Sequence, residues 1–309
     1  MLPTLIVVGA LFLLWVLVNL KTSRSDGTLV KNVPQYRIML GHILPTRNES
    51  VVYFDDYIRA EKLLEYLKQA KEKFNVDVTH ALVGAVSRTM AENPKMNQFV
   101  MGRRLYKRKG CHLSFSMKRV AMNKEAKLAA VKLEMKDGED FESLCGRIDG
   151  DIKTERSGEK TYSDKEFDLF LKIPRAVLVK AVRLFFWLDY HNLLPGSFIK
   201  NDAMYTSMFI ANLGSVQMGP GYHHLYEWGN CPLFMMAGRI EDKAMVEDGE
   251  LVSRKILHVR YSFDERVEDG LTASYGIATV RRILEDPFNS LGCLAEDGSD
   301  RPAIYKSTD

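Results

Sequence analysis

The side chains best suited to chemistry form one short charged turn. Residues 264–270 read Asp-Glu-Arg-Val-Glu-Asp-Gly, between a strand-like apolar segment and an apolar segment with helical spacing. The closing Asp-Gly pair favours a tight turn. Carboxylates at such a strand end can act as acids and bases, or they can pair with the arginine and hold the turn. We interpret Asp264, Arg266, Asp269 and Gly270 as structural.

A second group of reactive side chains lies in the glycine-rich segment 219–227, where two adjacent histidines stand among two tyrosines and a glutamate. Packed or solvated loop histidines are the ordinary interpretation. His223 or His224 could instead act as a general base, with Glu227 or Glu265 orienting the imidazole. A metal site is the weakest interpretation, because adjacent residues on an extended chain point in opposite directions.

The charged turn resembles the signature of an acyltransferase family. Catalytic domains of the dihydrolipoyl acyltransferases of 2-oxo acid dehydrogenases carry Asp-His-Arg-x-x-Asp-Gly at a strand end, and chloramphenicol acetyltransferases share this pattern. In that family the next helix ends in a Leu-Leu-Glu-Asp-Pro-like run, and residues 283–287 here read Ile-Leu-Glu-Asp-Pro. Two upstream segments agree: residues 211–214, Ala-Asn-Leu-Gly, resemble the family's Ser-Asn-Leu-Gly, and residues 92–97 resemble its His-Pro-Glu-Leu-Asn helix end.

The resemblance covers about residues 36–290, with an expanded insert at 158–205. It implies an α/β fold, a CoA-dependent acyltransferase-like mixed sheet flanked by helices. It also implies a homotrimer with active sites between subunits, and a coenzyme A thioester as ligand, for which Asn212 and Gly214 are the candidate contacts. In the family a histidine takes the proton of a CoA or dihydrolipoamide thiol, and a serine donates to the oxyanion. We expect neither a lipoyl group nor a metal on this chain.

This sequence departs from the family at both catalytic positions. Glu265 stands where the family has its histidine, and Ala211 where it has its serine. A carboxylate with a pKa of about 4.3 is a poor base for a thiol with a pKa of about 8.5, and loss of an oxyanion donor costs roughly a hundred-fold in rate. We favour a pseudoenzyme, a trimeric structural or scaffold subunit. The alternative is an active CoA- or carrier-dependent acyltransferase that uses His223 or His224 on an acceptor near the membrane; these two histidines and Glu265 are the candidate catalytic residues.

The other charged and imidazole side chains have simpler expected roles. For Asp269 the resemblance implies an arginine partner that braces the turn, and Arg37 and Arg47 are the candidates. The remaining histidines are isolated in the sequence, and we expect surface or core positions for them: His42, His80, His112, His191 and His258.

Alternating strands and helices must position these residues. A polar linker is expected at 21–35 and a C-terminal tail at 291–309. Apolar stripes predict helices at 61–73, 78–90, 141–154 and 271–284. Asp77 is suited to cap the second of these, and Asn93-Pro94 to end it. Strands are predicted at 51–54, 97–101, 104–108, 111–118, 126–135, 208–213, 233–240 and 256–263.

The first twenty residues differ from the rest, because an uncharged apolar run ends at Leu20. About 19 residues in a helix measure about 28 Å, close to a hydrocarbon core. No basic residue precedes the run, and Lys-Thr-Ser-Arg follows it instead of a small-x-small cleavage site. We therefore predict an uncleaved transmembrane anchor at 1–20 rather than a signal peptide. Lys21, Arg24 and Lys31 follow the run, so the positive-inside rule predicts a single-pass protein whose C-terminal domain is cytoplasmic.

Residues 174–190 form a second strongly apolar segment, which opens with a proline as a first helical turn tolerates. Apolar side chains cover more than half of its circumference, and Arg175, Lys180 and Arg183 form a basic strip. One interpretation is a helix buried in the domain. The other is a helix that lies in the membrane interface or against a partner subunit.

Composition excludes some classes of partner. The chain has 43 basic and 40 acidic residues and a net charge of +3, which is too weak an excess to indicate nucleic acid binding. A mildly basic chain beside a membrane still favours contact with anionic lipid. The four cysteines form no C-x-x-C pair, and we expect reduced thiols.

Overall fold

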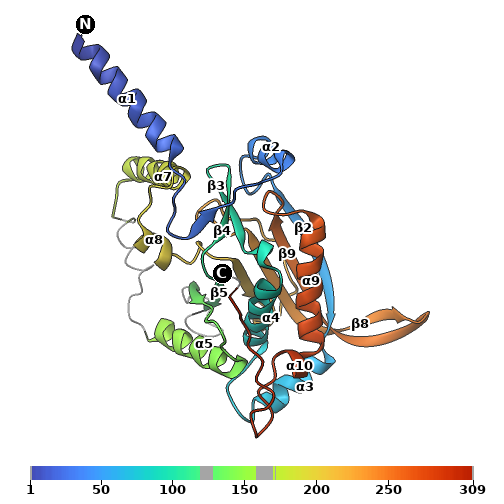
Figure 1. The fold of residues 1–309 in the computed structure, drawn as a ribbon. Coiled ribbons are helices and arrows are strands. Elements are labelled where there is room, and N and C mark those ends of the chain that lie inside the picture. Colours follow the sequence, from blue (N-terminus) through green and yellow to red (C-terminus); the bar gives the residue numbers. More distant parts are fainter. Residues whose placement is uncertain (1, 119–127, 158–169, 171, 308–309) are drawn as a thin grey trace.

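A six-stranded mixed sheet forms the centre of the fold (Figure 1). The computed structural model describes residues 2–118, 128–157, 170 and 172–307. The strand order is β2-β9-β8-β7-β5-β6; β7 runs parallel to β5 and β8, and the other pairs are antiparallel. This confirms the predicted mixed α/β class. The strands are β2 (Val51–Arg59), β5 (His112–Lys118), β6 (Leu128–Glu134), β7 (Met208–Asn212), β8 (Leu233–Glu247) and β9 (Glu250–Asp264).

Helices α3 (Glu61–Ala70), α4 (Val78–Glu92) and α9 (Gly270–Glu285) cover one face of this sheet, and Figure 1 shows α4 and α9 lying across it. Successive side chains of a strand point to opposite faces. One set of positions is therefore buried against the helices, and the other set lies on the side that we call the outer face. Ile58 is fully buried on the helix side, whereas its neighbour Tyr57 is exposed on the outer face.

Local signals set both ends of α4. Asp77 accepts a hydrogen bond from the His80 backbone N–H, and the His80 ring accepts one from the Asp77 N–H, each at 3.1 Å. The helix ends at Asn93-Pro94, because proline cannot donate the next helical hydrogen bond. Both predictions are confirmed. His80 has one of the surface or core positions expected for it, because it is buried, and its ring also lies 3.4 Å from a carboxylate oxygen of Asp149.

A second, three-stranded sheet packs beside the main one. Its strand order is β1-β4-β3, with β1 (Gly27–Leu29), β3 (Gln98–Met101) and β4 (Arg104–Arg108) all antiparallel. The strand β1 falls inside residues 21–35, which the sequence suggested to be a polar linker. That segment is instead part of the folded domain, because three residues are too few to leave a periodic pattern.

A buried ion-pair network holds this segment in place. The side chain of Arg24 has no solvent exposure and contacts the carboxylates of Asp26 at 3.0 Å and Asp189 at 2.9 Å. Asp189 also accepts a hydrogen bond from the Tyr205 hydroxyl at 2.7 Å. The network joins the segment after α1 to the end of α7 (Arg175–Tyr190), so these two parts of the chain are fixed to each other.

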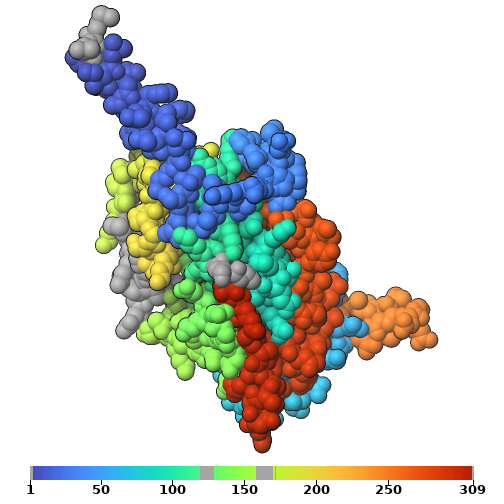
Figure 2. All heavy atoms as spheres, in the orientation of Figure 1, coloured from blue at the N-terminus to red at the C-terminus, as the bar shows by residue number. Residues whose placement is uncertain are grey.

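Helix α1 (Leu2–Leu20) projects away from the rest of the protein (Figures 1 and 2). Among the residues that the structure describes, it is the one helix whose length and composition suit a membrane crossing, and none of it is buried. The guanidinium of Arg104 donates hydrogen bonds to the backbone carbonyls of Asn19 and Lys21, the latter at 3.0 Å. The base of α1 is therefore tied to the small sheet.

The interpretation of α7 as a helix buried in the domain is wrong. Of its residues only Asp189 is buried, and Figure 1 shows the helix beside the base of α1. Phe185 packs face to face on Trp228, with ring centroids 4.0 Å apart, and this contact holds the inner side. The outer side exposes large apolar groups, namely Val177, Val179, Leu184, Phe186, Trp187 and Tyr190.

Of the expected C-terminal tail at 291–309, residues 291–307 are described, and Ile304 and Tyr305 among them pack in the main core. Of the expected insert at 158–205, residues 158–169 and 171 lie outside the described part of the chain. The remaining helical elements are α2 (Gln35–Ile43), α5 (Phe141–Arg156), α8 (Gly196–Asn201), α10 (Pro287–Ser290), and the short 3-10 helices η1 (Pro94–Met96) and η2 (Leu213–Val216).

The hairpin of β8 and β9 is longer than predicted and projects from the body of the protein (Figure 2). Residues 241–255 are mostly polar and lie beyond the main core, so their strands lack the apolar pattern that would reveal them. The four cysteines, by contrast, are free and buried, as the sequence predicted.

Replacing Arg24 by alanine should strongly destabilise the fold, because it leaves the buried carboxylate of Asp189 without its cation. We expect a loss of about 3–5 kcal/mol in the free energy of unfolding, measured by chemical denaturation of the full chain in detergent. The matched control is Arg59→Ala, whose exposed ion pairs should contribute only about 0–1 kcal/mol. Equal losses in the two variants would contradict the assigned role of Arg24.

Candidate functional site

The charged turn at residues 264–270 is built around one buried carboxylate. The Asp264 side chain has no exposure and accepts hydrogen bonds from the Ser50 hydroxyl at 2.9 Å and from the Arg266 guanidinium at 2.8 and 2.9 Å. The other guanidinium nitrogen of Arg266 donates to the Leu44 carbonyl at 3.0 Å. The expected ion pair is therefore present, and it also binds the loop that precedes β2.

Asp269 has a different role from the one that the resemblance implied. Its carboxylate caps α9 by accepting the Thr272 backbone N–H at 3.0 Å, and this hydrogen bond lowers the pKa of Asp269. Arg37 pairs with Glu268 instead, at 2.9 Å. Arg47 donates to two backbone carbonyls of the loop at residues 226–227. The expectation that Arg37 or Arg47 braces Asp269 is wrong, because the neighbouring Glu268 reaches Arg37 from inside the turn.

Ala211 and Glu265 lie at different levels of the sheet. The strand register places Ala211 of β7 level with Met236 of β8 and with Arg260 of β9. Glu265 comes five residues after Arg260, so it lies further along the direction of β9. Strand rise and spacing put Ala211 and Glu265 roughly 15 Å or more apart within one chain. No single reacting atom can contact both, so a site that uses both positions requires two copies of the chain.

Neither position is prepared for catalysis by its surroundings. Ala211 is 6% exposed and belongs to an apolar cluster with Phe209, Leu225 and Phe234. Glu265 is half-buried, and its backbone N–H donates to the Ser50 carbonyl at 3.0 Å. At position 211 the chain presents a methyl group to this cluster, where the resemblance implies a serine hydroxyl.

The two adjacent histidines lie on the outer face, in the loop that covers the Ala211 cluster. The His223 ring stacks on Phe234, with centroids 4.1 Å apart, and Phe234 stacks in turn on Phe209 at 4.9 Å. Burial lowers the pKa of His223, so its ring is neutral at pH 7. The structure thus brings His223 and Ala211 to one apolar cluster.

No carboxylate orients these histidines among the described contacts. Nδ1 of His223 lies 2.6 Å from the His224 carbonyl, and Nδ1 of His224 lies 3.1 Å from the Leu225 carbonyl. Glu227 turns away and accepts hydrogen bonds from the backbone and side chain of Asn48, at 3.1 and 3.2 Å. The arrangement fits packed loop histidines better than a general base with a carboxylate partner.

Asn212 and Gly214, the candidate contacts for a coenzyme A thioester, are placed by packing. The Asn212 amide donates to the Thr79 hydroxyl at 3.1 Å, which ties the end of β7 to the start of α4. A Cβ on Gly214 would lie 2.6 Å from the Gly238 carbonyl, so only glycine allows this close approach. The buried Oδ1 of Asn212 has no hydrogen-bond partner and could still accept one from a ligand.

A polar cluster that the sequence did not reveal lies on the outer face around Asp55. Its carboxylate contacts the His258 ring at 2.6 Å, Arg260 at 2.7 Å and the Tyr222 hydroxyl at 2.6 Å. Tyr57 stacks on His258 with centroids 4.4 Å apart, and His258 is buried, which agrees with the surface or core position expected for it. The alternation of β2 and β9 could have placed these residues on one face, but only the strand register brings them into contact.

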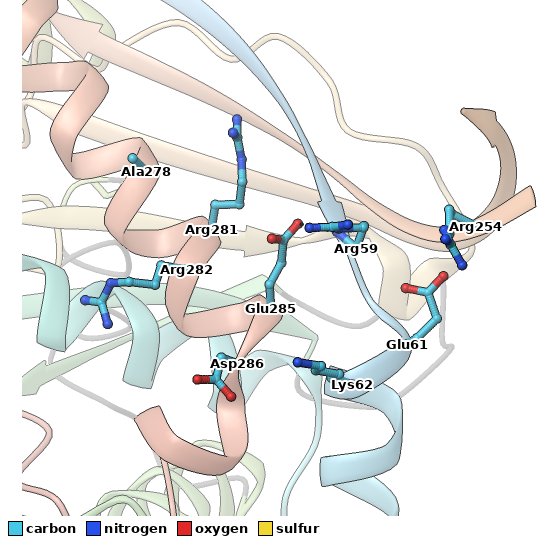
Figure 3. Close-up of a pocket in the computed structure, with 9 residues that line it drawn as sticks. All are labelled: Arg59, Glu61, Lys62, Arg254, Ala278, Arg281, Arg282, Glu285 and Asp286. Carbon is cyan, nitrogen blue, oxygen red and sulfur yellow. Dashed lines mark hydrogen bonds and ion pairs between the residues drawn. The ribbon is translucent and has the colours of Figure 1, made fainter. Parts of the chain in front are cut away.

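Two hollows are lined by neither Ala211 nor Glu265. One, of about 580 Å³, lies beside the charged turn and is lined by Arg266 and Arg37. The other, of about 630 Å³, lies between β2, α3 and α9 (Figure 3). Both acidic and basic side chains line it. Each of its arginines pairs with a carboxylate: Arg59 with Glu285, Arg254 with Glu247, Arg281 with Asp56, and Arg282 with Glu92. Charge pairing leaves this second hollow little attraction for an ion.

Comparison with known proteins finds one matching family. Residues 200–291, which contain Ala211, Glu265 and the charged turn, match the family described as 2-oxoacid dehydrogenases acyltransferase (catalytic domain). The resemblance to this acyltransferase family is confirmed. A segment of 50 residues, 16% of this chain, is 46% identical to the dihydrolipoyllysine-residue acetyltransferase component of the pyruvate dehydrogenase complex of Bacillus subtilis. It spans 11% of that relative, so the chain matches about a tenth of the relative's length.

Solved structures extend the likeness of the fold to most of the chain. A probable dihydrolipoamide acetyltransferase from Listeria monocytogenes superposes with a TM-score of 0.56 at 12% identity, over 89% of this chain and 99% of that one. The Azotobacter vinelandii dihydrolipoamide acetyltransferase superposes with a TM-score of 0.55 at 15% identity, over 85% and 94%. That structure comes from a study of a serine, a histidine and an asparagine in its catalytic mechanism. These likenesses establish an acyltransferase fold.

The two aspartates of the charged turn provide a matched test. Asp264→Asn should destabilise the protein by about 3–5 kcal/mol, because it leaves the buried Arg266 cation unpaired. Asp269→Asn should cost little, since asparagine caps a helix as well as aspartate does. Denaturant unfolding of the two variants measures the difference, and a larger loss for Asp269→Asn would show that the turn depends on the helix cap instead.

The Asp55 cluster predicts a specific pH dependence. Partial burial raises the pKa of Asp55, but hydrogen bonds from Tyr222, Arg260 and His258 outweigh that effect and lower the pKa to about 2. Because the folded pKa is depressed, the stabilisation is complete above the unfolded pKa of about 3.9 and is lost as the pH falls towards 2. Asp55→Asn should therefore be less stable than the native chain at pH 7, and the difference should shrink below pH 4.

Thermal unfolding between pH 7 and pH 2 measures this difference. The control is Asp248→Asn in the turn of the β8–β9 hairpin, where asparagine tolerates the left-handed backbone and no pH-dependent difference is expected. A difference at Asp55 that stayed constant down to pH 2 would rule out the charged form of Asp55 as its cause.

Proposed function

We propose that this protein is a membrane-anchored scaffold with an acyltransferase fold, assembled as a homotrimer and unable to transfer acyl groups by the family's usual residues. One combination of features carries the proposal: the charged turn has its structural ion pair, but the two positions at which the resemblance implies catalytic residues have other side chains. Asp264 and Arg266 retain a buried ion pair, while Glu265 between them and Ala211 on β7 replace the histidine and the serine that the resemblance implies.

The spacing in the Azotobacter vinelandii enzyme supports this register. The histidine and asparagine named in its catalytic study are four positions apart, as are Glu265 and Asp269. Its serine precedes the histidine by 52 positions, and Ala211 precedes Glu265 by 54. A carboxylate in place of an imidazole and a methyl group in place of a hydroxyl would each remove one element of acyl-transfer chemistry.

Assembly is supported by what the chain leaves uncovered. The outer face exposes Tyr53, Tyr57 and Tyr222 beside the Asp55 cluster, and exposed aromatic groups of this kind are enriched in protein interfaces. The separation of Ala211 and Glu265 within one chain is the second support, because a family-type site would then form between copies. We assign the outer face to contacts between subunits of the homotrimer.

Membrane attachment is supported by α1 and its surroundings. Helix α1 is long enough to span a bilayer, and its apolar side chains are exposed along its length. Of the three basic residues after it, Arg24 is neutralised by buried carboxylates, while Lys31 is exposed and Lys21 is partly exposed. Lys21 and Lys31 thus supply the basic flank that favours a cytoplasmic domain.

The alternative, an acyltransferase that uses His223 or His224, has weaker support. A neutral His223 could accept a proton, but both rings lie against backbone carbonyls and aromatic groups, and no carboxylate partner is in reach among the described contacts. Backbone carbonyls orient the rings, but without a carboxylate neighbour neither ring gains added stabilisation of the protonated form that a general base passes through. We therefore favour the scaffold.

The test follows the formation of S-acetyl-dihydrolipoamide and free CoA from acetyl-CoA and dihydrolipoamide by chromatography with mass detection, using the full chain in detergent. The native chain should show no turnover above buffer. The double variant Ala211→Ser/Glu265→His should gain measurable transfer, because it restores the donor and the base, and Glu265→Gln is the matched control. Turnover by the native chain that disappears in His223→Ala would overturn the scaffold proposal and support the alternative.

A further inference from the structure

The hollow beside the charged turn is strongly basic and lies directly at the end of α1. We call it the basic groove. Of the residues that line it, none is acidic and five are cationic: Lys31, Arg37, Arg103, Arg104 and Arg266. Its volume is about 580 Å³, which is large enough for a headgroup and the first carbons of two acyl chains.

The cations of the groove are not all neutralised by the protein. Arg266 and Arg37 have the partners Asp264 and Glu268. Lys31 and Arg103 are exposed, and no carboxylate pairs with either among the described residues. The groove therefore has at least two unmatched positive charges, which distinguishes it from the charge-paired hollow of Figure 3.

A buried donor also points to a missing ligand. Arg37 is 8% exposed, and its Nε has no hydrogen-bond partner although the terminal nitrogens of the same guanidinium contact Glu268, the Val267 carbonyl and Tyr36. An unpaired buried N–H costs free energy, so such a group ordinarily has an acceptor. Arg37 lines the groove, so an anion bound there would lie beside a guanidinium whose hydrogen-bonding capacity is not fully used.

The other wall of the groove is apolar. It consists of Leu29, Val30, Val33, Ile38, Val100 and Leu105. The neighbouring helix α2 exposes Tyr36, Met39 and Ile43 to solvent. A small inorganic anion would leave this apolar wall unused, whereas an amphiphile with a charged head would cover both walls.

The position of the groove identifies the source of such an amphiphile. Arg104 lines the groove and also donates to the backbone carbonyls of Asn19 and Lys21, on either side of the last residue of α1. Figure 1 shows α2, the small sheet and α7 at this same end of the protein. If α1 spans the bilayer, the groove lies at the level of the lipid headgroups.

We propose that the basic groove binds the phosphodiester headgroup of an anionic phospholipid, with the apolar wall against its acyl chains. Guanidinium and ammonium groups form strong charge-assisted hydrogen bonds with phosphate oxygens. The inference rests on the proposed membrane attachment. It also connects the lipid to the charged turn, because Arg266 belongs to the turn and Arg37 pairs with Glu268 of the turn.

The experiment titrates the delipidated full chain, held in a neutral detergent, with dioctanoyl phosphatidylglycerol and follows heat release by calorimetry. The native chain should bind in a saturable manner, and dioctanoyl phosphatidylcholine should bind far more weakly. Lys31→Gln/Arg103→Asn should weaken phosphatidylglycerol binding about thirty-fold. Each cation near a membrane surface contributes about 1 kcal/mol, which is a factor of about five in affinity, and the variant removes two of them. Asparagine suits position 103, where φ is +60°.

The matched control is Lys68→Gln/Lys71→Gln, which removes the same charge from the α3 region, away from the groove, and should bind like the native chain. Equal weakening in both double variants, or no binding by the native chain, would overturn the groove assignment. Binding of inorganic phosphate or coenzyme A that exceeds binding of phosphatidylglycerol would overturn the lipid assignment in favour of a soluble phosphate.

Alkaline carbonate extraction of vesicles that carry the native chain reports membrane attachment separately. Release of the chain by carbonate would contradict the anchor even if phosphatidylglycerol bound to the groove. If the chain is retained and the groove variant binds lipid as the native chain does, the membrane anchor is supported and the lipid site in the groove is refuted. The two failures are therefore distinguishable.

Discussion

The fold depends on how one buried carboxylate is satisfied. Asp264 ends the longest strand pair of the main sheet with no solvent exposure, and a buried charge without partners would be costly. Its oxygens accept hydrogen bonds from Ser50 and Arg266, and Arg266 in turn donates to the Leu44 carbonyl. The requirement to satisfy this one group brings the loop before β2, the end of β9 and the start of α9 together.

The same turn joins the two sheets. Val267 is fully buried and packs with Val100 and Leu105 of the small sheet, while Arg37 from α2 pairs with Glu268. A change at Glu265 disturbs none of these contacts, because its side chain lies at the half-buried edge of the turn. The framework of the turn is therefore compatible with different residues at position 265.

The end of the protein at which α1 joins the folded domain is held by a second set of charged contacts. Arg24 fixes the segment after α1 to Asp189 at the end of α7, and Arg104 fixes the last turn of α1 to the small sheet. A helix that merely served as a tether would need neither contact. Their presence means that the orientation of α1 and the exposed apolar side of α7 are set by the folded domain, so the proposed scaffold would meet the bilayer with a defined surface.

The sequence by itself determined the elements whose signals are local. The Asp77 cap, the stop at Asn93-Pro94, the apolar run of α1 and the strand–turn–helix around Asp264 all depend on neighbours within a few positions, so their residue types reveal them. Only the tertiary structure decided the contacts between distant positions: Arg24 with Asp189, Asp55 with His258, Glu268 rather than Asp269 as the partner of Arg37, and the separation of Ala211 from Glu265. These contacts depend on strand register and on which of two neighbouring carboxylates lies closer to the buried cation. Local spacing in the sequence contains neither piece of information. Two distant side chains contribute to stability only when the folded chain brings them into contact.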